Sequence, residues 1–366
     1  MYAHAIQATN YPPSGELVYL LDQKRPFAIA YFNANTQLMA RVLTLDIKAK
    51  IDEAFFFKRF SKALAKRERL IPVPYYRLVH AEGDSLPGLV IDRFGDKLVV
   101  QTSTLGMEKL KPIWLPVLKS LLSPAEIIFR NDIPHRELEG LPLTVEQTEI
   151  PLAIPVIENQ VTFFAAPVEG QKTGWFYDQR ANRKWVAKNA KGKTLLDMYT
   201  YSGGFGITAQ VNGAIHTTLV DSSEKSLQLA MRAAEENNVS NHCTFVRAKV
   251  FDYLETLIQE GKTFEFVVVD PPAFIKNSKD IKPGLRGYEK LAKLAAQVVA
   301  PNGTLFIASC SHHASVDDFH QSVLKGIEKA ERTPELLYKG GADKDHPIHP
   351  MLPENHYLKA FAFQLS

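Results

Sequence analysis

The sequence predicts an α/β fold built on a doubly wound, mostly parallel sheet, and two observations support this. From about residue 194, β-branched runs alternate with helical stretches such as 225–237 and 287–299, as is typical of such sheets. The run from Phe266 to Val269 is too apolar for a half-exposed strand, so we expect it in the middle of the sheet. The expected strands end at Asp197, Asp221, about Ala248, Asp270 and Cys310.

The elements before residue 194 predict two smaller domains. Short β-like runs fill residues 16–45, and a basic helix is expected over about 51–69. A hairpin turning at Gly95–Asp96, a helix near 107–122, and strands near 126–130 and 142–165 follow. At the other end, residues 357–365 alternate like a late antiparallel edge strand. We expect a β domain with the basic helix at 1–70, a small central α/β domain at 71–165, and the large sheet domain at 166–366.

Composition excludes several classes of protein. The chain has 366 residues, of which 45% are hydrophobic and 23% charged, as in a folded globular protein. No apolar run approaches the roughly 18 residues of a membrane span, and the start has no signal-peptide pattern. Two cysteines give no disulfide framework, so we expect a cytoplasmic protein without a membrane partner. Neither cysteine nor the adjacent pair His312–His313 has metal-ligand spacing, so no metal is expected.

Positive charge gathers in the first 75 residues, which carry eleven Lys/Arg against six Asp/Glu in a chain of net charge +3. On the expected helix, Lys58, Lys62 and Lys66 lie on a different face from Phe56 and Phe60. Such a face is either a solvated surface or a nucleic-acid footprint, and the helix by itself favours the solvated surface.

A glycine-rich turn with an acid before it indicates the cofactor. The strand ending at Asp197 leads to Gly203 and Gly204, and Asp221 ends the next strand, where an acid suits a ribose diol. A dinucleotide fingerprint would place its glycines directly after the strand. Here Asp197 stands at that point and would repel a pyrophosphate, whereas it suits a cationic ligand. We therefore expect S-adenosylmethionine and not NAD.

The same edge of the sheet gathers the other reactive side chains. Ligands of parallel sheets bind beyond the carboxyl ends of the strands, so Asp270, Pro271, Pro272, Phe274 and Cys310 are expected in one crevice. An acid, an aromatic plate and a thiol indicate chemistry on a flat, ring-shaped substrate. The plainer interpretations are core packing for Phe274 and an apolar filler for Cys310.

Four motifs in this order carry a family resemblance: residues 170–180 (GQKTGWFYDQR), 197–206, 270–274 (DPPAF) and 309–311 (SCS). They closely resemble the class I S-adenosylmethionine-dependent ribosomal RNA large-subunit methyltransferase I family, which forms 5-methylcytosine. Residues 76–79 and 82–93 resemble its middle domain, and the resemblance covers roughly 16–365. It implies an N-terminal PUA RNA-binding domain, a small central domain and a Rossmann-like methyltransferase domain.

The resemblance also implies roles for individual residues. The methionine end of the cofactor would be surrounded by Lys172, Thr173, Asp178 and Arg180. The glycine-rich turn beside the cofactor would contribute Asp197, Tyr199, Gly203 and Gly204. The ribose would be held by Asp221 and Ser222. Cys310 would be the nucleophile.

Two positions depart from the family pattern. The family has a Lys/Arg-rich segment before its Gly-Glu-Leu stretch, whereas Met1 to Ser14 contain no Lys or Arg. We therefore expect a truncated PUA-like domain with altered RNA binding. At the third strand end the family commonly has an acid where this chain has Lys249, so weaker cofactor binding is expected.

The chemistry that these residues allow is methylation of carbon 5 of cytosine. That carbon is a poor nucleophile until a thiolate adds to carbon 6, which needs a cysteine in the crevice. The position of Cys310 and its motif favour it over Cys243, which keeps the filler interpretation. Asp270 would hydrogen-bond the base near N3 and N4, the prolines would stiffen the loop, and Phe274 would stack on the base.

The expected partner is RNA, most simply large-subunit ribosomal RNA. A base in structured RNA must be unstacked before it enters such a pocket, which favours a separate RNA-binding module and a functional role for the basic front part. Formation of a homodimer is left open by the sequence. Two other functions also stay open: methylation of a base nitrogen, which needs no thiol, and a catalytically decayed RNA-binding or ribosome-assembly factor, which Lys249 and the short front end would explain.

Overall fold

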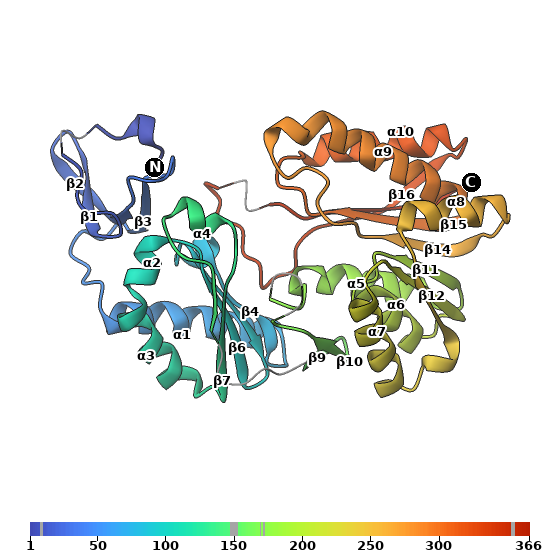
Figure 1. Cartoon of the computed structure of the whole chain (residues 1–366), viewed down its shortest axis with the longest axis horizontal. Helices are drawn as coiled ribbons and strands as arrows, with labels where there is room; N and C mark the ends of the chain where they lie inside the picture. Colours follow the sequence, from blue (N-terminus) through green and yellow to red (C-terminus); the bar gives the residue numbers. More distant parts are fainter. Residues whose placement is uncertain (8–9, 147–152, 169, 171–172, 353–355) are drawn as a thin grey trace. The chain divides into compact units, whose positions relative to one another are not determined.

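The computed structural model describes residues 1–7, 10–146, 153–168, 170, 173–352 and 356–366, which form two compact units (Figure 1). Unit 1 comprises residues 1–154, 166–175 and 344–352, and unit 2 comprises 155–165, 176–343 and 353–366. Residues 166–175 and 344–352, which the sequence assigns to the expected domain at 166–366, therefore belong to unit 1. The division into three domains remains a prediction.

The first sheet of unit 1 is the small all-β element expected from residues 16–45. It is an antiparallel sheet of β1 (Leu17–Asp22), β2 (Arg25–Phe32) and β3 (Ala40–Thr44). Along β1 the side chains of Leu17, Tyr19 and Leu21 are exposed, and Leu20 between them is buried. The alternation follows from the period of two in a strand, which turns one face of β1 to solvent.

The second sheet of unit 1 has five strands in the order β4-β5-β6-β7-β8. Their bounds are β4 Tyr75–His80, β5 Leu89–Phe94, β6 Lys97–Thr102, β7 Glu126–Asn131 and β8 Thr144–Glu146. The predicted hairpin at Gly95–Asp96 is confirmed, with Gly95 at φ +66°. The helix predicted near 107–122 is two helices, α2 (Leu105–Lys109) and α3 (Lys111–Leu122), because Pro112 starts a new helix. A short helix, α4 (His135–Leu138), follows β7.

The basic helix is confirmed as α1 (Glu53–Leu70), whose N-cap Asp52 accepts a hydrogen bond from the Phe55 amide. Phe56 and Phe60 are buried in the core of unit 1, whereas Lys58 and Lys62 are exposed. The amphipathic pattern therefore packs one face of α1 and leaves a basic face in solvent.

Arg67 of α1 departs from this pattern because its side chain is fully buried. Its guanidinium donates two hydrogen bonds to the carboxylate of Asp84, at 2.9 and 2.5 Å, and one to the backbone oxygen of Asp345, at 3.1 Å. Asp345 also accepts the Arg77 amide at 3.0 Å. These bonds tie the segment 344–352 into unit 1.

The sheet of unit 2 has seven strands in the order β13-β12-β11-β14-β15-β17-β16. The strands are β11 Thr194–Met198, β12 His216–Asp221, β13 Cys243–Arg247, β14 Phe264–Val269, β15 Val299–Ser309, β16 Pro334–Gly340 and β17 Lys359–Leu365. The first five in the order are parallel, which confirms the predicted mostly parallel sheet. A hairpin of β9 (Ile154–Glu158) and β10 (Val161–Ala165) stands apart from this sheet.

The predicted edge position of residues 357–365 is wrong. β17 runs antiparallel between β15 and β16, so β16 is the edge strand. The alternation of Phe361 and Phe363 with Ala360 and Ala362 reflects two packed faces, because the phenylalanines join one core cluster and the alanines the other. Large and small apolar residues mimicked the apolar–polar pattern of an edge strand.

Helices cover both faces of this sheet (Figure 1). Residues of α8, α9 and α10 pack in the cluster on one face, and residues of α5 and α6 pack in the other. The helices are α5 Arg180–Asn189, α6 Gly204–Val211, α7 Glu224–Glu236, α8 Val250–Gln259, α9 Ile281–Gln297 and α10 Val316–Lys329. Short 3-10 turns occupy 3–5, 81–84, 177–179, 240–242 and 278–280. The predicted doubly wound arrangement is therefore confirmed.

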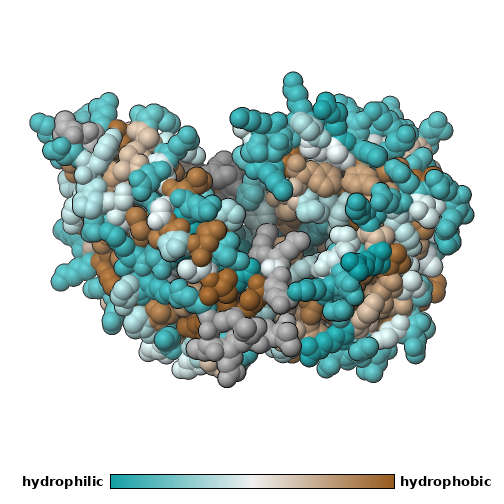
Figure 2. Space-filling model, in the orientation of Figure 1, coloured by the Kyte–Doolittle hydropathy of each residue, from teal (hydrophilic) through white to brown (hydrophobic). Residues whose placement is uncertain are grey.

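One face of the molecule is mostly polar. Figure 2 shows hydrophilic residues over most of the visible face, interrupted by small hydrophobic patches. Within the described ranges, none of the helices combines the length and the apolar character that crossing a membrane requires.

Candidate functional site at the carboxyl edge of the large sheet

Three acids stand at the carboxyl ends of neighbouring strands of unit 2. Asp197 is the penultimate residue of β11, Asp221 ends β12, and Asp270 directly follows β14. In the ladder, Asp197 pairs with Leu219 of β12 and with Val268 of β14. Because the three strands are parallel, their acids meet at one edge of the sheet, where ligands of such folds bind.

Asp197 is fully buried, and its Oδ2 accepts the Gly206 amide at 2.8 Å and the Thr200 hydroxyl at 2.5 Å. Its Oδ1 has no hydrogen-bond partner among the residues that the structure describes. Burial raises the pKa of the Asp197 carboxyl to about 7. The hydroxyl of Ser202, in the same turn, is also buried, and no described residue hydrogen-bonds to it. Unsatisfied buried oxygens are rare, and these two suit a ligand that brings donors or positive charge.

The turn between β11 and α6 is tightly wound. Tyr199, Tyr201 and Gly203 have φ values of +60°, +51° and +85°, and Gly204 then begins α6. Two tyrosines in the left-handed region are uncommon, and such strain concentrates at functional sites. The Asp221 carboxylate supports the turn by accepting the Tyr201 amide at 3.0 Å.

The same carboxylate accepts the Ser223 amide at 2.8 Å through its other oxygen. Each oxygen of Asp221 keeps a second lone pair, which can accept a hydrogen bond from a ribose hydroxyl. Ser222 next to it is exposed. Lys249, at the N-cap of α8 after the neighbouring strand β13, is exposed as well.

The motif 170–180 is divided between the two units. In unit 2, the Asp178 carboxylate accepts a hydrogen bond from the Tyr357 hydroxyl, and Arg180 pairs with Asp343 at 2.9 Å. Thr173 belongs to unit 1, where its hydroxyl donates to the buried Asp92 at 2.5 Å. Lys172 lies outside the described residues. Within unit 2, therefore, the structure holds Asp178 and Arg180 near the start of α5.

Asp270 is held by a residue of the same motif that sequence reasoning missed. The Gln179 amide donates to Asp270 Oδ2 at 2.9 Å, and Asn182 in turn donates to the Gln179 oxygen at 2.5 Å. Burial, together with the negative charges of Asp178 and Asp197, raises the pKa of the Asp270 carboxyl to about 7. The Asp270 carboxyl can therefore both donate and accept a proton near neutral pH.

Cys310 follows β15 and is half-buried, while Ser309 and Ser311 on either side are buried. Both serine hydroxyls contact the Tyr288 hydroxyl of α9, at 2.9 and 2.8 Å. Ser311 Oγ also accepts the amide of Ile275, in the loop after β14, at 3.2 Å. The loops that carry Asp270 and Cys310 are thus joined, and these two residues follow the ends of adjacent strands.

Comparisons with known proteins agree with this geometry. Residues 137–363 match the family of S-adenosylmethionine-dependent methyltransferases. The ribosomal RNA large subunit methyltransferase I of Klebsiella pneumoniae is 33% identical over 360 residues, covering 95% of this chain and 89% of the relative. The chain belongs to the ribosomal RNA large-subunit methyltransferase I family.

Two further comparisons support this assignment. The enzyme of the same name from Shewanella amazonensis is 36% identical over 331 residues, covering 88% of this chain and 84% of the relative. A crystal structure of a methyltransferase complexed with S-adenosylhomocysteine superimposes with a TM-score of 0.83 at 22% identity, covering 97% of this chain and 93% of the other. That likeness shows the fold. This family member is therefore an S-adenosylmethionine-dependent methyltransferase with a Rossmann-like fold.

The residues at the sheet edge fit the cofactor of this family. S-adenosylmethionine carries a sulfonium, an amino group and a ribose diol. The unpaired oxygen of Asp197 suits a cationic donor, and the free lone pairs of Asp221 suit the diol. Among the described residues, no group of three or more His, Cys, Asp or Glu side chains could hold a metal ion.

Phe274 and the prolines occupy the loop after β14. Pro271 is buried, Pro272 is exposed, and the half-buried Phe274 ring stacks on Tyr288 with centroids 4.6 Å apart. One face of Phe274 is therefore used for packing, the plainer of the two interpretations, and a stacking role toward substrate remains a prediction. Cys243 starts β13 at the opposite end of the sheet, and burial raises the pKa of its thiol to about 12, as an unreactive filler requires.

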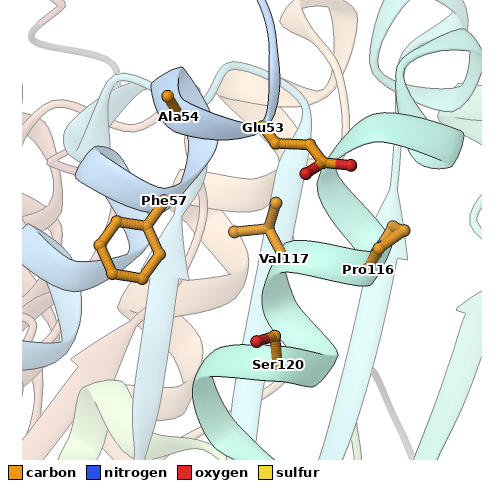
Figure 3. Close-up of a pocket in the computed structure, with 6 residues that line it drawn as sticks. All are labelled: Glu53, Ala54, Phe57, Pro116, Val117 and Ser120. Atoms are coloured by element: carbon orange, nitrogen blue, oxygen red, sulfur yellow. The ribbon is translucent and has the colours of Figure 1, made fainter.

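A groove on unit 1 is a weaker candidate for a site. It has a volume of about 500 Å³ and lies between α1 and α3, lined by Glu53, Ala54, Phe57, Pro116, Val117 and Ser120 (Figure 3). Its walls are mainly apolar, and one carboxylate and one hydroxyl do not form a set of convergent polar groups. A catalytic pocket needs such a set, so the groove carries no chemistry of its own.

Proposed function

We propose that this protein methylates carbon 5 of a cytosine in RNA, and that large-subunit ribosomal RNA, named for its relatives, is the substrate class. The observation that carries the proposal is the position of Cys310. Its half-buried thiol follows β15, and Asp270 follows the neighbouring strand β14. Methylation of a base nitrogen has no use for a thiol there, whereas carbon 5 requires one.

The thiolate of Cys310 would add to carbon 6 of cytosine, forming a carbon–sulfur bond and breaking the double bond between carbons 5 and 6. The electron pair makes carbon 5 nucleophilic. Bound S-adenosylmethionine supplies an electrophilic methyl group. Once carbon 5 is methylated, loss of its proton restores the double bond and expels the thiolate, so the cysteine is regenerated.

Asp270 would stabilise the adduct from the edge of the ring. Addition of the thiolate places negative charge on the ring nitrogen N3 and its neighbours. A carboxyl with a pKa of about 7 is protonated in part at neutral pH and can donate a hydrogen bond or a proton to N3. Gln179 orients this carboxyl. Pro271, Pro272 and Phe274 would shape the pocket for the base.

The cofactor would be held by the residues that the family pattern indicates. In unit 2 these are Asp178, Arg180, Asp197, Tyr199, Gly203, Gly204, Asp221 and Ser222, and we assign Lys172 and Thr173 to the same task. The support is strongest for Asp197 and Asp221, because their unused hydrogen-bonding capacity matches an ammonium group and a diol.

RNA binding would rest on the front of the chain. The exposed Tyr19 of β1 offers an aromatic ring for stacking, and Lys58 and Lys62 of α1 offer exposed positive charge. Not all of the positive charge here is available, because Arg67 is buried against Asp84. The PUA-like character of this part, a homodimer and a cytoplasmic location remain predictions.

The proposal is tested with RNA that contains 5-fluorocytidine. Fluorine at carbon 5 cannot leave as a proton, so the adduct on the cysteine persists after methylation. We expect a covalent protein–RNA complex that requires S-adenosylmethionine and withstands denaturation. Cys310→Ala should abolish both this complex and methylation of ordinary RNA, while the matched Cys243→Ala variant should keep both.

The other outcomes identify the alternatives. Full methylation of RNA by Cys310→Ala would point to a base nitrogen and overturn the carbon 5 mechanism. Absence of both S-adenosylmethionine binding by calorimetry and methyl transfer would point to the decayed RNA-binding factor. Mass mapping of ribosomal RNA from a deletion strain then identifies the nucleotide that is modified.

A further inference from the structure

Lys359 is a buried lysine at the start of β17 in the large sheet, and none of the motifs above includes it. It starts β17 and pairs with Ser309, the last residue of β15, in the antiparallel ladder. Only 2% of its surface is exposed. Lysine is almost never fully buried unless its ammonium group is paired, so this position needs a compensating interaction.

The compensation comes from the loop that carries Cys310. The Lys359 ammonium donates to the backbone oxygen of Ser311 at 2.7 Å and to that of Ala314 at 2.8 Å. An ammonium has three N–H groups, so these two carbonyls leave one unassigned. Both acceptors are neutral, and no carboxylate forms an ion pair with Lys359 among the described residues. A buried positive charge without a buried carboxylate beside it favours a nearby anion.

Cys310 is the group nearby that can become an anion. Burial lowers the pKa of Lys359 to about 8, and the charge of the Cys310 thiolate opposes this by raising it. The interaction is reciprocal, since a positive charge that is stabilised by a thiolate stabilises that thiolate equally.

We propose that Lys359 is a positioning residue that holds the loop 310–314 and stabilises the thiolate form of Cys310 as the attacking nucleophile. The inference deepens the proposed function and rests on it for the use of the thiolate in catalysis. It assigns no proton transfer to Lys359.

Other titratable groups face the same strand end. Tyr288 of α9 contacts Ser309 and Ser311, and burial raises the pKa of its hydroxyl, so it stays neutral and adds no charge. Asp270 directly follows the neighbouring strand β14, and its negative charge would oppose a thiolate. His312 lies in the same loop and stacks on Tyr357. Lys359 is therefore the buried cation among these groups.

The test measures the reactivity of the thiol without RNA or methyl transfer. The rate at which iodoacetamide alkylates Cys310 is followed from pH 6 to pH 10 by peptide mass spectrometry, with Cys243 as an internal reference. Lys359→Gln keeps a donor for the carbonyls without the charge, Lys359→Met removes both, and Lys359→Arg keeps both. Lys339→Gln, at an exposed position on β16, is the matched control.

We expect the pH midpoint for Cys310 to rise by about one unit or more in the Gln and Met variants, and alkylation near neutral pH to slow about tenfold. The Arg and Lys339 variants should stay near the wild-type profile. A wild-type profile in Lys359→Gln would overturn the role of the charge. In the unmodified protein, a midpoint at or above the ordinary thiol value of about 8.5 would overturn it without any variant.

These outcomes are separable from those of the proposed function. A shifted midpoint together with no 5-fluorocytidine adduct would leave the Lys359–Cys310 interaction standing and remove the carbon 5 mechanism. A Cys310-dependent adduct together with unchanged midpoints would support the carbon 5 mechanism and remove the Lys359–Cys310 interaction.

Discussion

The hydroxyls of Tyr288 and Ser311 lie 2.8 Å apart, and this contact joins α9 to the loop that carries Cys310. The same tyrosine hydroxyl accepts a hydrogen bond from Ser309 at 2.9 Å and lies 3.4 Å from the Phe274 amide. One hydroxyl group therefore connects the two loops that would grip the base from adjacent strands. The serines on either side of the cysteine serve this connection, which explains the motif 309–311 in physical terms.

Tyr288→Phe removes the shared hydroxyl and keeps the ring that stacks on Phe274. Two buried serine hydroxyls then lose a partner, so we expect the free energy of unfolding in urea to fall by about 1–3 kcal/mol. Methyl transfer should slow by lowering kcat, while S-adenosylmethionine binding by calorimetry stays unchanged. Tyr253→Phe, on α8, is the control and should alter neither quantity. An unchanged kcat in Tyr288→Phe would mean that the two loops act independently.

Asp221→Asn tests the assignment of the ribose. In the wild-type protein both carboxylate oxygens accept backbone amides and keep lone pairs for a diol. In Asn an NH₂ group replaces one carboxylate oxygen and would face an N–H or O–H donor that the oxygen accepted. We therefore expect S-adenosylmethionine affinity to fall about 10- to 100-fold. Isothermal calorimetry measures the change. Glu235→Gln removes a charge from the exposed face of the neighbouring helix α7 and should bind as the wild type does. Equal affinity in both variants would remove Asp221 from the cofactor site.

The strand ends that carry acids could be predicted because each is a local pattern. A short apolar run followed by Asp197, Asp221 or Asp270 defines a buried strand and its carboxyl end with no knowledge of distant residues. The parallel order of the strands then brings the acids together. Cys310 was placed by the same reasoning.

The supporting residues could not be predicted, because their roles depend on tertiary pairing. Tyr288 reaches the site through the packing of α9, and Lys359 through the insertion of β17 between β15 and β16. A lysine in an otherwise apolar strand was the available signal for Lys359. The division of the motif 170–180 between two compact units also depends on tertiary contacts, and the cofactor role of Thr173 stays a prediction.

The stability of unit 2 should depend on pH through Asp197. Burial raises its pKa in the folded state to about 7, above the value near 4 of an unfolded chain. The folded state therefore binds more protons between these values. Its stabilising contribution is present in full below about pH 4 and is lost as the pH rises through about 7. For this group the free energy of unfolding falls by at most about 1.4 kcal/mol per pH unit.

Asp197→Asn isolates this contribution, because the Asn side-chain oxygen can still accept the Thr200 and Gly206 donors. Urea unfolding of both proteins at pH 5 and pH 8 gives the difference in stability, in which all other titrating groups cancel to first order. We expect the free energy of unfolding of the variant to increase relative to that of the wild type as the pH rises. A difference that does not depend on pH would place the Asp197 pKa at its ordinary value.

The buried ion pair of Arg183 and Glu158 should stabilise unit 2 only while both partners are present. Arg183 donates to the two carboxylate oxygens at 2.6 and 2.8 Å, and both side chains are buried between α5 and the β9–β10 hairpin. Arg183→Met leaves a buried carboxylate with less compensation, so we expect a loss of about 3–5 kcal/mol in unfolding free energy. The double variant with Glu158→Leu should lose clearly less than the sum of the single changes. The matched exposed pair, Arg247 and Glu224 at 2.7 Å, should change stability by less than about 1 kcal/mol when either partner is removed. Additive losses at Arg183 and Glu158 would show that burial of the individual groups, and not their pairing, sets their effect.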